Sequence, residues 1–236
     1  MEFVKAKNYD AMSDMASDLM MRKVQEKPHA LFCLATGSSP TASYHLFVEK
    51  VKKEKLDVSK LKIVKLDEWF GLPESSPATC EYYLQENLLK PLHISKDRYI
   101  AFHPMEENTQ FECSRIERLI QEAGGIDLCI LGLGRNGHLG FNEPAEKSYP
   151  FTHKALLETK TKSHPMLVGN QEEAQYGYTL GIGNLLRARA IAFLITGQGK
   201  KEAYEAFQKA FLSAWHPANY LWLHKDVTCF VDEESV

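Results

Sequence analysis

The 236-residue sequence lacks the features that mark membrane, secreted and nucleic-acid-binding proteins. No apolar stretch approaches the roughly 20 residues that cross a bilayer, and residues 1–8 lack the charged-then-apolar layout of a signal peptide. Its 28 lysines and arginines face 31 acidic residues, and neither sign forms a long block. We therefore expect a cytoplasmic protein without a membrane or nucleic-acid partner.

Signatures of metal and nucleotide sites are missing as well. The five cysteines show no C-x-x-C spacing, and three lie inside apolar runs, which predicts small buried side chains without disulfides. Nine histidines occur without H-E-x-x-H or a comparable ligand spacing, so we expect no metal site. The P-loop pattern G-x-x-x-x-G-K-[ST] is absent too, which argues against ATP or GTP.

Apolar strand-like runs alternate with segments of helical period along the whole chain. In residues 111–122, for example, Ile116, Leu119 and Ile120 recur at helical spacing among charged residues. Such alternation predicts an α/β protein with a mainly parallel open sheet and helices on both faces, a Rossmann-like three-layer arrangement. Because no linker or repeat interrupts it, we expect residues 1–236 to form a single domain. Further helices are predicted at 41–54 and 200–211, and the last strand at 227–231.

Four of the apolar runs end abruptly in polar or glycine-rich clusters. The carboxyl ends of parallel strands meet at one edge of a sheet, where open α/β proteins bind their ligands. We therefore expect Thr36, Asp67, His138 and Lys200, one from each cluster, around a single pocket. The four runs are residues 30–34, 61–66, 127–132 and 191–195.

The cluster at residues 36–40, Thr-Gly-Ser-Ser-Pro, lies between a predicted strand and a predicted helix. It offers free backbone N–H groups, three hydroxyls and the positive pole of the helix, which suit a phosphate. A polar turn that only caps the helix would have the same sequence pattern. Lys200 opens another predicted helix, where a cation is unfavourable unless an anion lies nearby. A phosphorylated small molecule explains both placements.

The pattern Gly132-x-Gly134-x-x-Gly137 matches the dinucleotide fingerprint, and Glu158 lies near the distance of a ribose-binding acid. That fingerprint needs a helix to begin at its third glycine, whereas the following residues contain two prolines and little helical period. A nicotinamide cofactor is therefore disfavoured. His138 lies among these glycines at a strand end, which favours a catalytic role over a purely structural one.

Asp67 and Glu68 follow a strand-like run and precede the aromatic pair Trp69-Phe70. Carboxylates in a surface loop are normally solvated. Aromatic neighbours that exclude water would raise the carboxyl pKa and make a stronger base. A proton-abstracting carboxylate is therefore predicted here.

Together these motifs resemble the glucosamine-6-phosphate deaminase and galactosamine-6-phosphate isomerase family, within a superfamily that also holds 6-phosphogluconolactonases. The G-H-x-x-F-N-E-P portion of residues 137–144 is typical of the deaminase branch. The matching segments follow the family order and cover nearly the whole chain: 35–41, 66–73, 132–144, 178–183 and 196–200.

The resemblance implies isomerisation and deamination of a 2-amino-2-deoxyhexose 6-phosphate to a ketohexose 6-phosphate and ammonia. It assigns His138, supported by Glu143, to opening of the sugar ring, and Asp67 to moving a proton from C2 to C1. The Gly132 backbone would approach the sugar, and neither a metal nor an organic cofactor is implied. The family's phosphate cradle corresponds to Thr36, Gly37, Ser38, Ser39 and Lys200.

Two candidate site residues depart from the family pattern. Asn136 stands where the better-known glucosamine enzymes carry an aspartate, and an amide cannot stabilise an imidazolium through charge. His164 stands where a phosphate-binding arginine is expected, and we expect neighbouring Lys162 to compensate as a point charge. Since both changes fall beside the sugar, we hypothesise a preference for galactosamine 6-phosphate, with tagatose 6-phosphate as the product.

Two other functions stay open at this point, a lactonase acting on 6-phosphogluconolactone and a sugar-phosphate sensor that binds without turnover. A lactonase could survive loss of the Asp67 carboxylate, whereas a deaminase could not. A homo-oligomer is open too, because members of the resembled family range from monomers to hexamers. Residues 146–175, with few apolar positions in register, are expected to form a mobile lid over the site.

Overall fold

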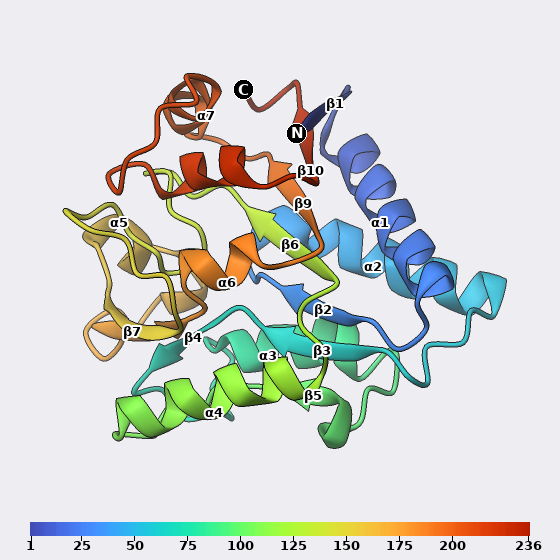
Figure 1. Cartoon of the computed structure of the whole chain (residues 1–236), viewed down its shortest axis with the longest axis horizontal. Helices are drawn as coiled ribbons and strands as arrows, with labels where there is room; N and C mark the ends of the chain where they lie inside the picture. Colours follow the sequence, from blue (N-terminus) through green and yellow to red (C-terminus); the bar gives the residue numbers. More distant parts are fainter.

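A seven-stranded sheet runs through the centre of the computed structural model, which describes residues 1–236 (Figure 1). All of its neighbouring strands pair in parallel. From the top of Figure 1 downwards the order is β1 (Glu2–Ala6), β10 (Val227–Asp232), β9 (Ala190–Ile195), β6 (Leu128–Gly132), β2 (Leu31–Leu34), β3 (Lys62–Lys65) and β5 (Tyr99–Ile100).

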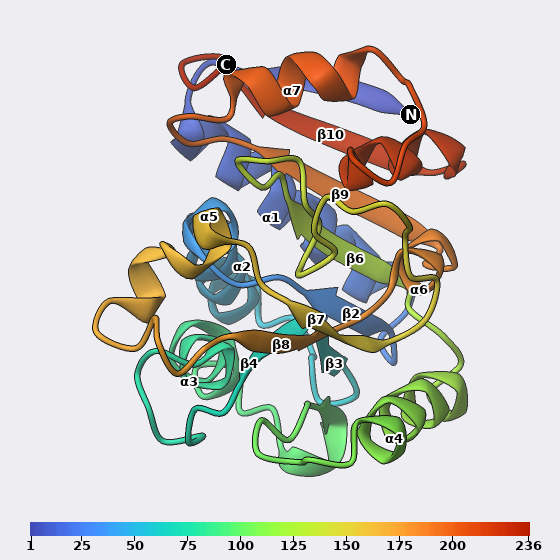
Figure 2. The ribbon, with the colours of Figure 1, turned by 90° about the vertical axis from the view of Figure 1, so that its left-hand side faces the viewer.

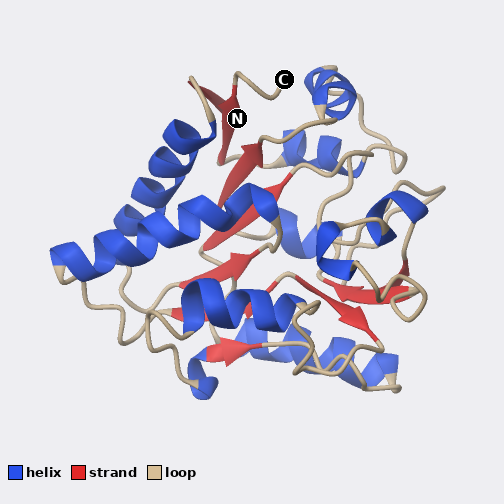
Figure 3. Cartoon of the chain, turned by 180° about the vertical axis from the view of Figure 1, so that it is seen from behind, coloured by secondary structure: helices blue, strands red, loops and turns tan.

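Helices cover both faces of this sheet because its strands are apolar on both sides (Figure 3). In β2, Leu31 and Cys33 belong to one core cluster, whereas Phe32 and Leu34 belong to the other. The first cluster takes in α4 (Thr109–Glu122), α6 (Ile182–Leu186), α7 (Lys201–Gln208) and the 3₁₀ segment η4 (Pro217–Leu223). The second takes in α1 (Tyr9–Glu26), α2 (Ser38–Glu54) and the turns from α3 (Cys80–Leu84) through the π-helical η1 (Gln85–Leu89).

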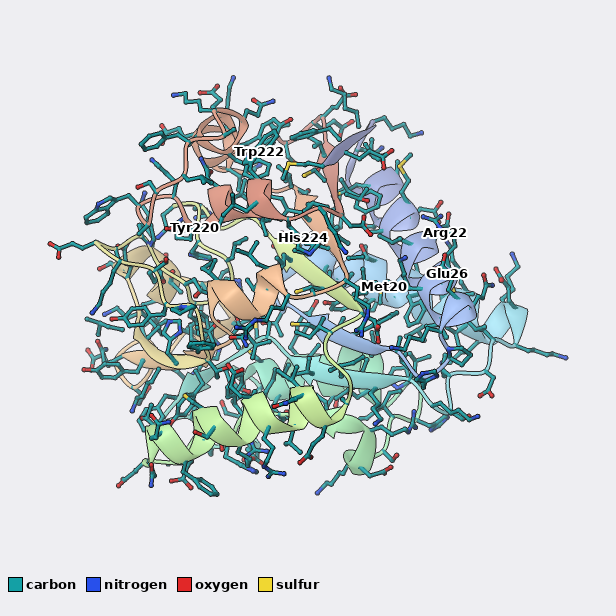
Figure 4. All side chains as sticks on the ribbon, viewed as in Figure 1. Met20, Arg22, Glu26, Tyr220, Trp222 and His224 are labelled. Carbon is teal, nitrogen blue, oxygen red and sulfur yellow. The ribbon has the colours of Figure 1, made fainter.

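The two faces are closed by amphipathic elements, as the labelled side chains in Figure 4 illustrate. On α1, Met20 is fully buried, whereas Arg22 and Glu26 are exposed. On η4, Trp222 donates from its indole nitrogen to the Phe207 carbonyl at 2.8 Å, which ties this segment to α7. Helix α1 and strand β1 are elements that the sequence patterns did not bring out.

A second, antiparallel sheet lies beside the carboxyl ends of the main strands (Figure 2). It contains β4 (Asp67–Phe70), β8 (Tyr176–Thr179) and β7 (His153–Leu156) in the order β4-β8-β7. Asp67 lies in a strand and not in a loop, because the chain leaves β3 at Leu66 and continues as strand β4. Pairing with β8 fixes the backbone of Asp67 more firmly than a loop would.

The predicted fold class is confirmed, with small shifts at the element ends. The predicted strands at 30–34, 61–66, 127–132, 191–195 and 227–231 are present as β2, β3, β6, β9 and β10. Of the predicted helices, 111–122 is α4, 41–54 begins three residues earlier as α2, and 200–211 is the shorter α7. No helix combines the length and the apolar character needed to cross a membrane.

The order of the strands also explains where a ligand can bind. From β2 the chain passes through α2 to β3 on one side, whereas β6 lies on the other side of β2 and leads on to β9. The connections therefore leave neighbouring strands β2 and β6 in opposite directions. Such a switch point opens a crevice at the carboxyl ends of the strands, and the four polar clusters lie there.

The segment 146–175, which was expected to be a lid, contains β7, helix α5 (Thr159–Lys162) and the 3₁₀ turn η3 (Pro165–Leu167). Its Leu157 and Leu167 are buried in a third core cluster with Trp69 and Phe141. The segment therefore packs on the second sheet and closes one side of the crevice. Its mobility stays a prediction.

Candidate active site

A cavity of about 210 Å³ lies at the switch point, at the carboxyl ends of β9, β6, β2 and β3. Side chains far apart in the sequence meet there because these four strands are consecutive in the sheet. The sequence-predicted site residues that line the cavity are Thr36, Gly37, Ser38, Ser39, Asp67, Gly132, Asn136, His138, His164 and Lys200. Glu143 does not line it but stands directly behind the histidine.

The phosphate-type corner is built by the turn from β2 into α2. Gly37 has a φ of 99°, which a residue with a side chain rarely adopts, and α2 begins at the next residue. Tyrosine hydroxyls brace the turn from behind, since Tyr83 donates to the Gly37 carbonyl at 3.0 Å and Tyr9 to the Ser38 carbonyl at 2.7 Å. With its carbonyls held away, the turn presents the positive end of α2 to the cavity.

Lys200 closes this corner from the adjacent β9 loop. Its Nζ donates to the Ser39 hydroxyl at 2.9 Å. Burial lowers the pKa of the Lys200 ammonium to about 8, and the charge of Arg135 contributes to that shift. Lys200 is therefore a cation held ready at a helix N-terminus, although part of its population is neutral at slightly alkaline pH.

His164 faces the same corner but does not supply positive charge. Its Nε2 lies 3.2 Å from where a Cβ on Gly37 would stand, so its ring covers the turn. Burial lowers the pKa of His164 to about 4, and the charges of His138, Lys200 and Arg135 act in the same direction. At neutral pH the ring is uncharged and offers a hydrogen bond in place of an ion pair.

The expectation that Lys162 compensates for the missing arginine is not supported. Its Nζ donates to the Gln175 side chain at 3.0 Å, and the residue does not line the cavity. Helix α5 directs it towards β8, whereas Lys160 on the same short helix reaches the cavity wall.

Asp67 is a buried carboxylate at the start of β4, 5% exposed. Burial raises the pKa of Asp67 to about 7, and the neighbouring charge of Glu68 adds to the rise. The Lys65 ammonium and the Cys80 thiol oppose it. Asp67 is consequently a far stronger base than a solvated aspartate, and about half of its population is ionised at pH 7.

Glu68 has a structural task beside this base. One or other of its carboxylate oxygens accepts hydrogen bonds from the backbone N–H groups of Trp69, Cys80 and Glu81, and the buried Lys65 ammonium lies at 2.7 Å. These hydrogen bonds offset the free-energy cost of removing the Lys65–Glu68 ion pair from water, because every charged group in the cluster has partners. Glu68 thereby fastens the start of α3 to β4, next to Asp67.

A short hydrogen-bond chain connects the phosphate-type corner to the base. Thr36 donates from its hydroxyl to the Cys80 sulfur at 3.2 Å, and the Cys80 thiol donates to Asp67 Oδ1 at 3.8 Å. The thiol is fully buried, and burial raises its pKa well above the usual range, so it stays a neutral donor. All five cysteines are free and buried, as predicted.

His138 is held against the cavity by the glycine loop after β6. A Cβ on Gly134 would come within 2.3 Å of the imidazole ring, so only glycine leaves room for it. Its Nδ1 lies 3.4 Å from Glu143 Oε2 and 3.2 Å from the Thr161 hydroxyl, which leaves Nε2 for the cavity. No helix follows Gly137, so these glycines serve the histidine and not a dinucleotide.

Asn136 acts on the histidine through Glu143. Its amide donates to Glu143 Oε2 at 3.0 Å and to Glu158 at 3.2 Å, and its oxygen accepts from the backbone N–H of His138. Although burial opposes ionisation, hydrogen bonds from His138, Thr161 and Asn136 hold the pKa of Glu143 below its usual value. Glu143 is thus the carboxylate that faces the imidazole. Glu158, considered earlier as a ribose-binding acid, instead joins this network.

Several cavity residues escaped the sequence reasoning. They include Arg135, Lys160, Thr161 and Phe141. Arg135 carried a usable signal, because it stands between two glycines of a strand-end loop, immediately before Asn136. The others come from segments whose position over the site depends on the second sheet.

A buried carboxylate that titrates near neutral pH, a histidine with its own carboxylate and an anion-binding corner share one crevice, which is typical of an enzyme. Comparison with known proteins gives its class. The chain belongs to the family of glucosamine-6-phosphate isomerases and 6-phosphogluconolactonases, whose sequence profile matches residues 5–229.

Within that family its similar relatives are deaminases. A protein of Escherichia coli (strain K12), whose name describes it provisionally as the deaminase AgaI, is 43% identical over 228 residues, which cover 97% of this chain and 90% of that protein. The glucosamine-6-phosphate deaminase of Thermoanaerobacter sp. (strain X514) is 35% identical, with coverage of 100% and 94%.

Solved structures show the same similarity to deaminases. A monomeric glucosamine-6-phosphate deaminase superposes with a TM-score of 0.92 at 29% identity, covering 99% of this chain and 98% of that one. The 6-phosphogluconolactonase of Thermotoga maritima shares the fold, with a TM-score of 0.76 at 20% identity and 97% of each chain covered. The protein is therefore an enzyme whose similarity is greater to the deaminases than to the lactonases.

Proposed function

We propose that this enzyme isomerises and deaminates a 2-amino-2-deoxyhexose 6-phosphate, releasing ammonia and a ketohexose 6-phosphate. The observation that carries the proposal is the Asp67 carboxyl, whose pKa is raised to about 7 in a cavity that also contains an anion-binding corner. Removal of a carbon-bound proton needs such a base, and a phosphate anchored at the corner would fix the sugar beside it. The deaminase relatives support the same reaction.

In the proposed mechanism the sugar ring opens first. His138, with Nδ1–H donating to Glu143, uses Nε2 to take the proton of the anomeric hydroxyl and pass it to the ring oxygen. The bond between C1 and the ring oxygen then breaks and the open-chain aldehyde forms. Asn136 keeps Glu143 ionised by donating to it, so the imidazole retains one facing carboxylate without an aspartate at position 136.

Proton transfer between carbons follows. The Asp67 carboxylate removes the proton from C2 while O1 takes up a proton, which gives an enolamine. Asp67 returns its proton to C1 as the amino nitrogen loses one, so that C2 becomes an imine. Water then adds to C2, ammonia leaves, and the ketose 6-phosphate remains.

We further propose that galactosamine 6-phosphate is the preferred epimer. Support comes from Asn136 and His164, the two departures from the family pattern, which both line the cavity. The two epimers differ only at C4, so a preference requires contacts that distinguish the orientation of one hydroxyl. A kcat/KM on glucosamine 6-phosphate that equals or exceeds the value on galactosamine 6-phosphate would remove this preference.

The deciding experiment is an ammonia-release assay with both hexosamine 6-phosphates, run in parallel with 6-phosphogluconolactone hydrolysis. Ammonia and ketose in equal amounts from either amino sugar are expected. Hydrolysis of the lactone without ammonia release would identify a lactonase. Tight binding of all three compounds without turnover would identify a sensor, and either result would refute the proposal.

A further inference from the structure

We propose that Arg135 is the phosphate-binding guanidinium of this site, and that it replaces, from the loop after β6, the arginine missing at position 164. The proposal deepens the proposed function, on which it rests for the identity of the sugar but not for the binding of a phosphate monoester.

The side chain of Arg135 lies beside the turn after β9. Gly197 and Gly199 in that turn have φ values of 96° and 76°, and neither carries a side chain to fill the space above it. A Cβ on Gly199 would lie 3.8 Å from Arg135 Nε, and one on Gly197 would lie 3.7 Å from the Lys200 Cε atom. The two cationic side chains therefore lie along the same turn and both line the cavity.

Neither cation has a carboxylate partner. The one ion pair at the site joins His138 to Glu143, and neither Arg135 nor Lys200 belongs to any ion pair. Asp67 is the sole carboxylate among the residues that line the cavity. Burial is the main reason that the pKa values of Lys200 and His164 are lowered, and the charge of Arg135 adds to both shifts, which places its guanidinium near both groups. Two unpaired cations at a helix N-terminus match the charge of a dianion.

The chemistry of a phosphate monoester explains the division between the two side chains. Such a group carries a charge of about −1.5 to −2 at pH 7 and presents three oxygens. The backbone N–H groups of α2 and the Lys200 ammonium can each bind one oxygen as point donors, whereas the planar guanidinium of Arg135 can bind two at once. Neutral His164 covers the same corner without supplying charge.

Arg135 also lies in the loop that connects the anion-binding corner to the His138 side of the site. It directly precedes Asn136, whose side chain holds Glu143 against the catalytic histidine. In a family member with the arginine at position 164, the phosphate contact would come from the segment over the second sheet. Here it would come from the glycine loop that carries His138, so phosphate binding and the placement of the histidine depend on one loop.

The test compares Arg135→Gln and Arg135→Lys with Arg118→Gln, a control that removes another exposed arginine, from α4 and away from the cavity. Calorimetry measures binding of inorganic phosphate and of a hexitol 6-phosphate, which cannot react, and steady-state kinetics follow ammonia release. Arg135→Gln should raise Kd for the hexitol phosphate and KM for the amino sugar about 10–100-fold with little change in kcat. Arg135→Lys should fall between it and the control. Equal affinities in Arg135→Gln and Arg118→Gln would overturn the proposal.

A second variant tests the exchange of positions. His164→Arg, added to Arg135→Gln, should recover most of the lost affinity, because position 164 faces the Gly37 turn. Failure to recover would show that the two positions are not equivalent and would overturn that half of the proposal. If the wild type binds the hexitol phosphate but releases no ammonia, the proposed function fails while the binding arm still decides the role of Arg135.

Discussion

The site has two ends that work by different physical means. At the proposed phosphate end, the turn from β2 into α2 and the loops after β6 and β9 present backbone dipoles and cations without carboxylate partners. At the proposed proton-transfer end, Asp67 and Glu143 are buried carboxylates whose pKa values are moved in opposite directions. In the proposed mechanism, binding relies on backbone dipoles and cations, whereas proton transfer relies on carboxyl groups whose pKa values burial and hydrogen bonds have moved.

The opposite shifts of the two carboxyls follow from their partners. Asp67 has a weak thiol donor and a negative neighbour, so burial dominates and its pKa rises. Glu143 is buried as well, but His138, Thr161 and Asn136 all donate to it, and its pKa falls. The same functional group therefore gives a proposed base at Asp67 and an ionised partner for the histidine at Glu143.

The largest effect on activity is expected for Asp67→Asn. The amide keeps the shape of the side chain but cannot take the C2 proton, so ammonia release should fall about 10²–10⁴-fold. Binding of a hexitol 6-phosphate should be nearly unchanged, because the phosphate end is intact. A variant that retained more than a tenth of wild-type ammonia release would exclude Asp67 as the base.

The same variant should be more stable than the wild type at alkaline pH. The folded-state pKa of Asp67 is about 7 against 3.8 for a solvated aspartate, so the unfolded chain loses this proton first and stability falls as pH rises from about 4 to 7. Asp67→Asn removes that cost, which is at most about 4 kcal/mol. Denaturant unfolding at pH 4 and pH 8 measures the gain. A gain that did not grow with pH would contradict the shifted pKa.

Glu143→Gln tests the carboxylate whose pKa is lowered, which is the partner of His138. Without the carboxylate the imidazole has no negative partner, so kcat should fall about 10–100-fold and the dependence of kcat on pH should change. Glu158→Gln is the matched control, since Glu158 also accepts from Asn136 but does not contact the histidine. Equal kinetics in the two variants would mean that the charge beside His138 is dispensable.

The smallest effect is expected for Cys80→Ala, which cuts the chain from Thr36 to Asp67. The thiol lowers the pKa of Asp67, so its loss should move the acidic limb of the rate profile to higher pH and reduce kcat about two- to tenfold. Cys80→Ser should restore the hydrogen bond and most of the rate. Cys113→Ser, on α4, is the control. An unmoved profile in Cys80→Ala would show that the thiol does not act on the base.

Most of the fold and most of the candidate site residues were accessible from the sequence. The short apolar runs predicted buried strands. In a parallel sheet the ends of these strands meet at one edge, which brings together Thr36, Asp67, His138 and Lys200. Lys162 was misjudged because neighbouring residues on a four-residue helix point in different directions. Sequence spacing does not reveal which of them faces a pocket.

The sequence by itself determined the chemistry: which groups can ionise, where glycines permit tight turns, and which runs must be buried. Only the tertiary structure decided how those groups behave. The pKa of Asp67, the neutrality of His164 and the place of Arg135 beside Lys200 arise from burial and from charges brought close by folding. The reason is that electrostatic free energies depend on distance and on the exclusion of water, and both are properties of the folded chain.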